Sequence, residues 1–248
     1  MKNYACFFLS LIFFSSANAT LVTRLAGQAV YDSDLDITWV ADANLALTQQ
    51  FGLNLGSNIL DDSANTVGST GRLTWDNANV WIGGMNAANY LGFNDWRLAK
   101  TTFPDSGCYT DGTGTLVNQG FGCNASELGH LHYTEFGLPS NAFLNSGLGS
   151  ITEINKFSNI QDDYWSGTAF SNDSFWHFST YTGTNADDRI NKLFAWAVRD
   201  GDVETASVPE PTSLVIFIFG LAGLGYIGNR KSAISDSARF RCCSWKNS

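Results

Sequence analysis

The pattern of apolar and polar residues changes twice along the chain. Residues 28–32 and 35–40 alternate apolar and polar positions, which predicts two half-buried strands. Residues 75–91 place apolar side chains at helical spacing instead, with Thr74 suited to cap a helix and Gly92 suited to end it. The first half of the chain is therefore expected to pass from strands into a helix.

A second helix and a return to strands follow. A short helical pattern begins after Ser126, which is suited to cap it, and ends at Gly137. The apolar residues expected to face inward from it are Leu128, Leu131 and Phe136. Further strands are predicted at residues 164–167, 175–179 and 194–198. Helices in the middle, strands at both ends and long loops predict a single α+β domain whose two ends meet in one sheet.

The first 19 residues have the pattern of a secretion signal. Lys2 gives a positive start, residues 6–14 form a short apolar run, and Ala17-Asn18-Ala19 is a small-residue cleavage pattern. The apolar run is too short to cross a bilayer comfortably. We therefore expect the mature chain to begin at Thr20 and the exported domain to occupy residues 20–207.

The carboxyl end has three ordered features. Pro209, Glu210 and Pro211 are followed by an uncharged apolar segment over residues 212–229 and then by a basic pair, Arg230 and Lys231. The prolines hold the backbone extended. The apolar segment is about long enough to cross a thin bilayer as a helix, and the basic pair marks the cytoplasmic side. This predicts a transmembrane helix with the domain outside.

The tail over residues 208–231 resembles the PEP-CTERM sorting signal. In that family an exosortase, a membrane cysteine protease, recognises the Pro-Glu-Pro motif and releases or transfers the protein near it. The resemblance implies an exosortase partner, a sorting motif at Pro209, Glu210 and Pro211, and inner-membrane anchoring that gives way, after processing, to a cell-surface or extracellular location. Residues 232–248 depart from the family pattern and are expected to be a cytoplasmic extension.

Charge and cysteine content fit an exported domain. Residues 20–207 hold 21 Asp and Glu against 8 Lys and Arg, a net charge of −13. Such a surface repels phosphate backbones, which argues against nucleic acid as a partner. Cys108 and Cys123 are the two cysteines of this region, and in an oxidising compartment they are expected to form a disulfide. Closing that loop should stabilise the domain by about 3 kcal/mol.

Five segments of the exported region occur in the order of a known domain family. They are Leu35–Trp39, Trp75–Ala78, Asn94–Leu98, Tyr164–Gly167 and Phe194–Arg199. Together they resemble the Lcl carboxyl-terminal domain family of secreted and surface bacterial proteins. The resemblance implies a C-type-lectin-like fold and, because the namesake is an adhesin for sulfated polysaccharides, an extracellular polysaccharide partner. Ala99 replaces the family's usual proline, and the acidic surface disfavours polyanionic sugars.

Tryptophans are the first candidates for a ligand-binding surface. Trp39, Trp75, Trp96, Trp165 and Trp196 lie in the ordered segments at core-like spacing, so we expect them in the core. Trp81 and Trp176 fall off those faces. These two are the candidate exposed residues for stacking on a sugar ring.

Asp32, Asp34 and Asp36 are the candidate metal ligands. In a strand, alternation would place all three carboxylates on one face, and oxygen ligands suit Ca²⁺. An EF-hand loop would need Gly and Glu where this chain has Ile37 and Ala43. A solvated acidic edge is the competing interpretation, and apart from this calcium hypothesis no cofactor is expected.

The histidines and known motifs give no catalytic constellation. His130 and Glu127 share one helical face, half of a carboxylate-bridged di-iron pattern whose second copy is absent from the sequence. Surface or capping roles are therefore expected for His130, His132 and His177. The nucleophile-elbow, phosphate-loop and dinucleotide motifs are also absent.

These observations favour a non-enzymatic binding protein of the cell surface or extracellular matrix. A hydrolase acting on exopolysaccharide is the first alternative, because a pair of catalytic carboxylates is defined in space and leaves no fixed spacing in sequence. A structural matrix protein without a specific ligand is the second.

Overall fold

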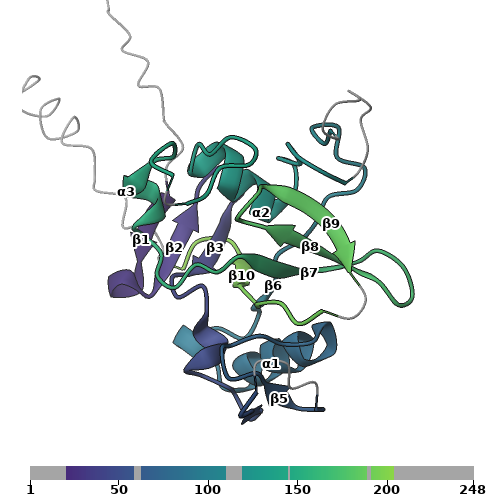
Figure 1. Cartoon of the computed structure of the whole chain (residues 1–248). Helices are drawn as coiled ribbons and strands as arrows, with labels where there is room; N and C mark the ends of the chain where they lie inside the picture. Colours follow the sequence, from purple (N-terminus) through teal and green to yellow (C-terminus); the bar gives the residue numbers. More distant parts are fainter. Residues whose placement is uncertain (1–20, 59–62, 110–118, 145, 189–190, 204–248) are drawn as a thin grey trace, which may run out of the picture. The chain divides into compact units, whose positions relative to one another are not determined.

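The computed structural model describes residues 21–58, 63–109, 119–144, 146–188 and 191–203. Its main sheet joins both ends of this region, as the sequence predicted. The strand order is β1-β2-β3-β10-β6, with antiparallel neighbours throughout (Figure 1). The strands are β1 (Leu21–Arg24), β2 (Ala29–Asp32), β3 (Ile37–Val40), β6 (Arg97–Leu98) and β10 (Ala197–Asp200).

Two smaller sheets complete the strand content. β7 (Asp163–Ala169), β8 (Phe175–Ser179) and β9 (Thr184–Asp188) form an antiparallel three-stranded sheet. β4 (Asn54–Leu55) and β5 (Thr66–Val67) form a short parallel pair. The predicted strand over 194–198 begins later than expected, at Ala197, whereas β1, β4, β5, β6 and β9 were not predicted.

The long predicted helix is confirmed with a shorter extent. Helix α1 (Trp75–Ala87) is capped by Thr74, whose side chain accepts a hydrogen bond from the Asn77 N–H at 3.2 Å. It stops before residue 91 because Asn89 takes a left-handed backbone conformation, with φ at +49°, and a 3₁₀ turn (Tyr90–Gly92) follows.

The other helical segments are short. Helix α2 (Glu127–His130) continues into a π-helical turn (Leu131–Glu135), and α3 (Ile151–Ile154) follows later. Leu128, Leu131 and Phe136 are buried as predicted. Ser126 precedes α2, but its hydroxyl accepts the Thr102 N–H at 3.1 Å and makes no capping bond to the helix.

The main sheet separates two hydrophobic cores. Trp39 and Val198 pack into the core that contains α2, whereas Val40 and Ala197, their neighbours in sequence, pack into the core that contains α1. Alternate residues of a strand point to opposite faces, so these central strands supply both cores at once. Trp39, Trp96, Trp165 and Trp196 are buried as predicted. Trp75 is half-buried and stacks on Phe175 at 3.9 Å.

Candidate functional site

An open groove of about 680 Å³ lies where several loops converge beside the three-stranded sheet. Its walls come from the segment before α1, the loop after the π-helical turn, the segment entering β7, the turn between β8 and β9 and the segment before β10. The lining residues are Thr70, Arg72, Phe143, Leu144, Ile160, Gln161, Asp162, Thr180, Tyr181 and Phe194. Clefts of this size, with mixed apolar and polar walls, are usual sites for small molecules.

Two exposed aromatic rings form one wall of the groove. The Phe143 and Tyr181 ring centroids lie 3.9 Å apart at an interplanar angle of 45°. Phe143 is 37% exposed and Tyr181 is 53% exposed. Side chains of this size are normally buried, so an exposed pair in contact marks a surface suited to a ligand.

Backbone contacts hold this aromatic pair in place. The Asn141 N–H donates to the Thr182 carbonyl at 2.8 Å, which ties the Phe143 loop to the β8–β9 turn. Gly183 closes that turn with φ at +79°, and a Cβ there would lie 2.5 Å from the Tyr133 hydroxyl. That hydroxyl donates to the Gly183 carbonyl at 2.6 Å. Glycine is therefore required in the turn that carries Tyr181.

A guanidinium group lies on the polar side of the groove. Arg72 donates to both carboxylate oxygens of Asp162 at 3.0 Å and to the Lys192 carbonyl at 3.0 Å. Its Cζ lies 4.6 Å from the centroid of the Phe194 ring. These contacts fix the orientation of Arg72 while its side chain stays 26% exposed. The groove thus combines an apolar face with oriented hydrogen-bonding groups, an arrangement that suits a ring with one apolar face and polar edges.

The expected exposure of Trp81 and Trp176 is wrong. Trp81 is 0% exposed, because it lies three residues after Ala78 and four before Met85 and so belongs to the buried stripe of α1. Trp176 is 2% exposed and is flanked by the rings of Phe103 and Phe170, at 6.2 and 5.0 Å. Neither indole can stack on a ligand from outside.

The sequence suggested that the three aspartates share one face of a strand, and this expectation is wrong. β2 ends at Asp32, and residues 33–36 form the turn into β3. Asp32 is buried, and its Oδ1 accepts the Asp34 and Leu35 N–H groups at 3.0 and 3.1 Å. Asp36, with φ at +52°, instead accepts a hydrogen bond from the Tyr31 hydroxyl at 2.8 Å. Only Asp32 and Asp34 approach a common point.

That common point is the imidazole of His130. Its Nε2 lies 3.9 Å from Asp32 Oδ2, 3.8 Å from Asp34 Oδ2 and 3.4 Å from Glu135 Oε1. Burial alone would lower the pKa of His130, but the adjacent Glu135 and Asp32 carboxylates outweigh burial and raise it. The surface or capping role expected for His130 is therefore wrong.

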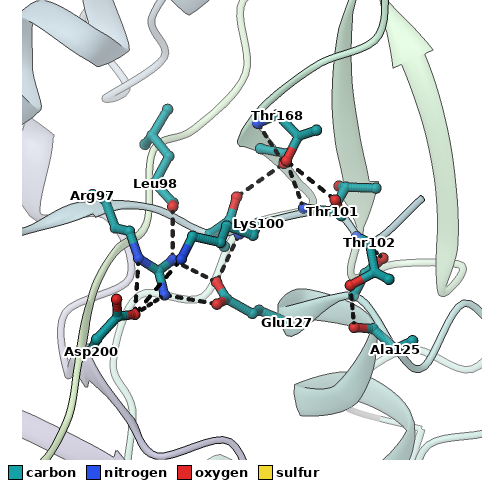
Figure 2. A network of polar contacts seen from close by, with 12 residues as sticks. Arg97, Leu98, Lys100, Thr101, Thr102, Ala125, Glu127, Thr168 and Asp200 are labelled. Carbon is teal, nitrogen blue, oxygen red and sulfur yellow. Dashed lines mark hydrogen bonds and ion pairs between the residues drawn. The ribbon is translucent and has the colours of Figure 1, made fainter. Parts of the chain in front are cut away.

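His130 and Glu127 do not act together, although they share a helical pattern. The Glu127 carboxylate receives two hydrogen bonds of 2.7 Å from Arg97 and one of 2.7 Å from the Lys100 N–H (Figure 2). Arg97 also pairs with Asp200, so this network joins α2 to β6 and β10. It is a structural contact between elements.

The other two histidines are not surface residues. His132 is 1% exposed, and both its ring nitrogens lack a hydrogen-bond partner among the described residues. Burial lowers the pKa of His132 to about 4, despite the nearby Pro139 carbonyl. His177 is half-buried, and burial lowers its pKa as well.

The predicted disulfide between Cys108 and Cys123 is confirmed. Asp105 lies close to both sulfurs, but the bonded cysteines have no thiolate to offer a metal. Asp105 instead accepts the Gly107 and Ala125 N–H groups, each at 2.9 Å, and so braces the two chain segments that the disulfide joins.

The sorting and anchoring residues lie outside the described residues. These are the signal over 1–19, the motif Pro209, Glu210 and Pro211, the segment 212–229, and the basic pair Arg230 and Lys231. Within the described part of the chain, no helix is both long and apolar enough to span a membrane.

Comparison with known proteins adds no family to this description. No family model, curated protein or solved structure matches the chain.

The groove was not predicted from the sequence. Its signal there is isolated aromatics within polar, turn-rich loops: Phe143 in Ser-Asn-Ala-Phe-Leu-Asn and Tyr181 in Ser-Thr-Tyr-Thr-Gly.

Proposed function

We propose that this chain is an exported, non-enzymatic binding protein whose groove takes a segment of a neutral extracellular polysaccharide. The exposed Phe143–Tyr181 pair carries the proposal. Aromatic rings pack on the apolar C–H face of a pyranose, and Arg72 and Gln161 line the same groove with donors for hydroxyl groups.

The charge of the domain selects among polysaccharides. A net charge of −13 over residues 20–207 opposes the approach of sulfated or uronic acid polymers. Arg72, the one positive side chain among the described residues that line the groove, is paired with Asp162. Neutral sugars escape this repulsion and are the expected ligands.

Binding without cleavage is favoured by the carboxylates present. Glycoside hydrolysis uses two carboxyl groups flanking the scissile bond. Asp162 is the single carboxylate among the described residues that line the groove, and both its oxygens accept bonds from Arg72. A general acid or nucleophile partner for it is missing from this lining, which supports the binding role over the hydrolase.

The groove proposal is tested with a glycan array that carries neutral and acidic oligosaccharides, probed with the full chain in a mild detergent. We expect binding to neutral glycans, weakened at least tenfold in Tyr181→Ala and in Phe143→Ala. Phe170→Ala is the matched control, because Phe170 is 45% exposed but lies outside the groove lining. Equal affinity in all variants, or preference for sulfated glycans, contradicts the proposal. Shortening of the oligosaccharides with time would support the hydrolase instead.

We further propose that the domain has the C-type-lectin-like fold of the Lcl carboxyl-terminal family and reaches the surface through exosortase sorting. The ordered segments between residues 35 and 199 support the first part, and the Pro-Glu-Pro tail supports the second. Replacing Pro209, Glu210 and Pro211 with alanine should retain the protein in the inner membrane, because the protease would lose its extended recognition motif. Immunoblots of surface and membrane fractions measure this, and an unchanged distribution would count against sorting.

A further inference from the structure

Four ionisable side chains from two distant segments converge away from the groove. Asp32 and Asp34 come from the β2–β3 turn, and His130 and Glu135 come from α2 and its π-helical extension. Ligand atoms of Asp32, His130 and Glu135 all lie within 4.8 Å of one another. The Asp32 side chain is 0% exposed, Glu135 is 5% and His130 is 12%.

Two buried atoms in this cluster have no hydrogen-bond partner among the described residues. They are Asp32 Oδ2 and His130 Nε2, which face each other at 3.9 Å. Asp32 Oδ1 is already engaged by two backbone N–H groups, and this fixes the direction in which Oδ2 points. A buried carboxylate oxygen left unpaired is costly, so such an atom in a native structure normally has a partner, which can be an ordered water or a bound ion.

The spacing of the donor atoms suits a metal ion. Separations of 3.4 to 3.9 Å around His130 Nε2 are mostly too long for direct hydrogen bonds. A tetrahedral ion with bonds of about 2.1 Å holds its ligands roughly 3.4 Å apart. Three carboxylates beside one imidazole also supply the negative charge that a divalent cation neutralises.

We propose that Asp32, His130 and Glu135, with Asp34 at the exposed rim, bind a divalent transition-metal ion, with Zn²⁺ preferred. The nitrogen ligand decides against Ca²⁺ and Mg²⁺, which favour oxygen throughout, and agrees with the N and O ligand set of zinc. An ion here would join the β2–β3 turn to α2, two segments that lie about 100 residues apart in the sequence. Its role would be structural, because the groove residues do not take part in the cluster.

The rival occupant of the cluster is a proton. A protonated His130 among three carboxylates would also balance charge without any metal. The two explanations predict different results when metal is added at neutral pH. Only a metal site gives saturable metal binding with a fixed stoichiometry.

The test is a calorimetric titration of the chelator-treated full chain in mild detergent with ZnCl₂ at pH 7. Cys242 and Cys243 are changed to serine in every protein compared, so that vicinal thiols do not contribute. We expect one Zn²⁺ per chain, with at least tenfold weaker binding in Asp32→Asn and in His130→Gln. Asp36→Asn is the matched control, because Asp36 lies in the same turn but bonds to Tyr31.

Each outcome decides the proposal. Binding that is lost in both cluster variants and kept in Asp36→Asn supports it. The absence of saturable binding up to 100-fold molar excess of zinc overturns it, as does affinity that is unchanged in the variants. Saturable Ca²⁺ binding without zinc binding overturns the choice of metal. If circular dichroism shows that Asp32→Asn does not fold, His130→Gln decides alone. His130 is half-buried, whereas Asp32 is fully buried, so replacing His130 disturbs the fold less.

Discussion

Single buried side chains determine how this domain responds to pH. His132 packs edge-on against Tyr133 and Phe178, with ring centroids 4.7 and 5.6 Å away. Burial holds its pKa at about 4, below the ordinary value of 6.5. Between pH 6.5 and 4 the unfolded chain therefore binds a proton that the folded domain does not bind. The free energy of unfolding falls as the pH falls through this window.

We expect His132 to contribute about 2–3 kcal/mol to the stability lost between pH 7.5 and 4.5. Urea unfolding of the wild type and of His132→Phe at both pH values measures this. Phenylalanine keeps a ring of similar shape and cannot titrate, so the variant should lose correspondingly less stability in acid. His177 is present in both proteins and serves as a shared background. An identical loss in the two proteins would contradict the assignment.

For single residues, the sequence predicted the disulfide but not the burial and neighbours of several side chains. The disulfide followed from the count of cysteines in a segment that the sequence predicts to be exported. The exposed positions predicted for Trp81 and Trp176 were wrong. The buried stripe of α1 is wide enough to include Trp81, and the rings of Phe103 and Phe170 flank Trp176. The His130 cluster depends on a turn and a helix that meet only in the fold, so spacing in the sequence carries no trace of it.

Between elements, the ion pair of Arg97 and Glu127 is a contact that holds α2 to the sheet. The Glu127 side chain is 14% exposed and Arg97 is 21% exposed, whereas Asp200 is 70% exposed. Removing the partner of a mostly buried charge costs far more than removing an exposed one.

Glu127→Gln is expected to lower the free energy of unfolding by about 2–3 kcal/mol, because Arg97 and the Lys100 N–H both lose a charged acceptor. Asp200→Asn, on the same arginine, should cost less than about 1 kcal/mol. Denaturant unfolding at pH 7 compares the two. Equal losses in both variants would show that burial does not set the strength of this network.

The elements themselves were largely predictable, and their ends were not. Helix α1 was expected from its apolar spacing and its Thr74 cap, and both are confirmed. Its early end at Ala87 depends on left-handed Asn89, a conformation that an asparagine permits but does not require. β9 was missed because Thr184–Asp188 is polar and half-buried, so its place in the sheet comes from pairing with β8.

At the scale of the whole molecule, the α+β class and the joining of both ends in one sheet followed from the sequence. The groove did not, because five separate segments build it and none has a binding motif of its own. Its aromatic wall depends on the hydrogen bond from Asn141 to Thr182 and on the Gly183 turn. Such convergence of loops is a property of the folded chain.

Sugar binding in this groove is the central claim, and nuclear magnetic resonance of the ¹⁵N-labelled chain measures it directly. Titration with the strongest neutral oligosaccharide from the array should shift the backbone amides of Phe143 and Tyr181, the Arg72 Nε–H and the Gln161 side-chain amide. The amides around Phe103 and Phe170 should stay unchanged. Shifts confined to that second aromatic surface, or no saturable shifts at all, would contradict the central claim.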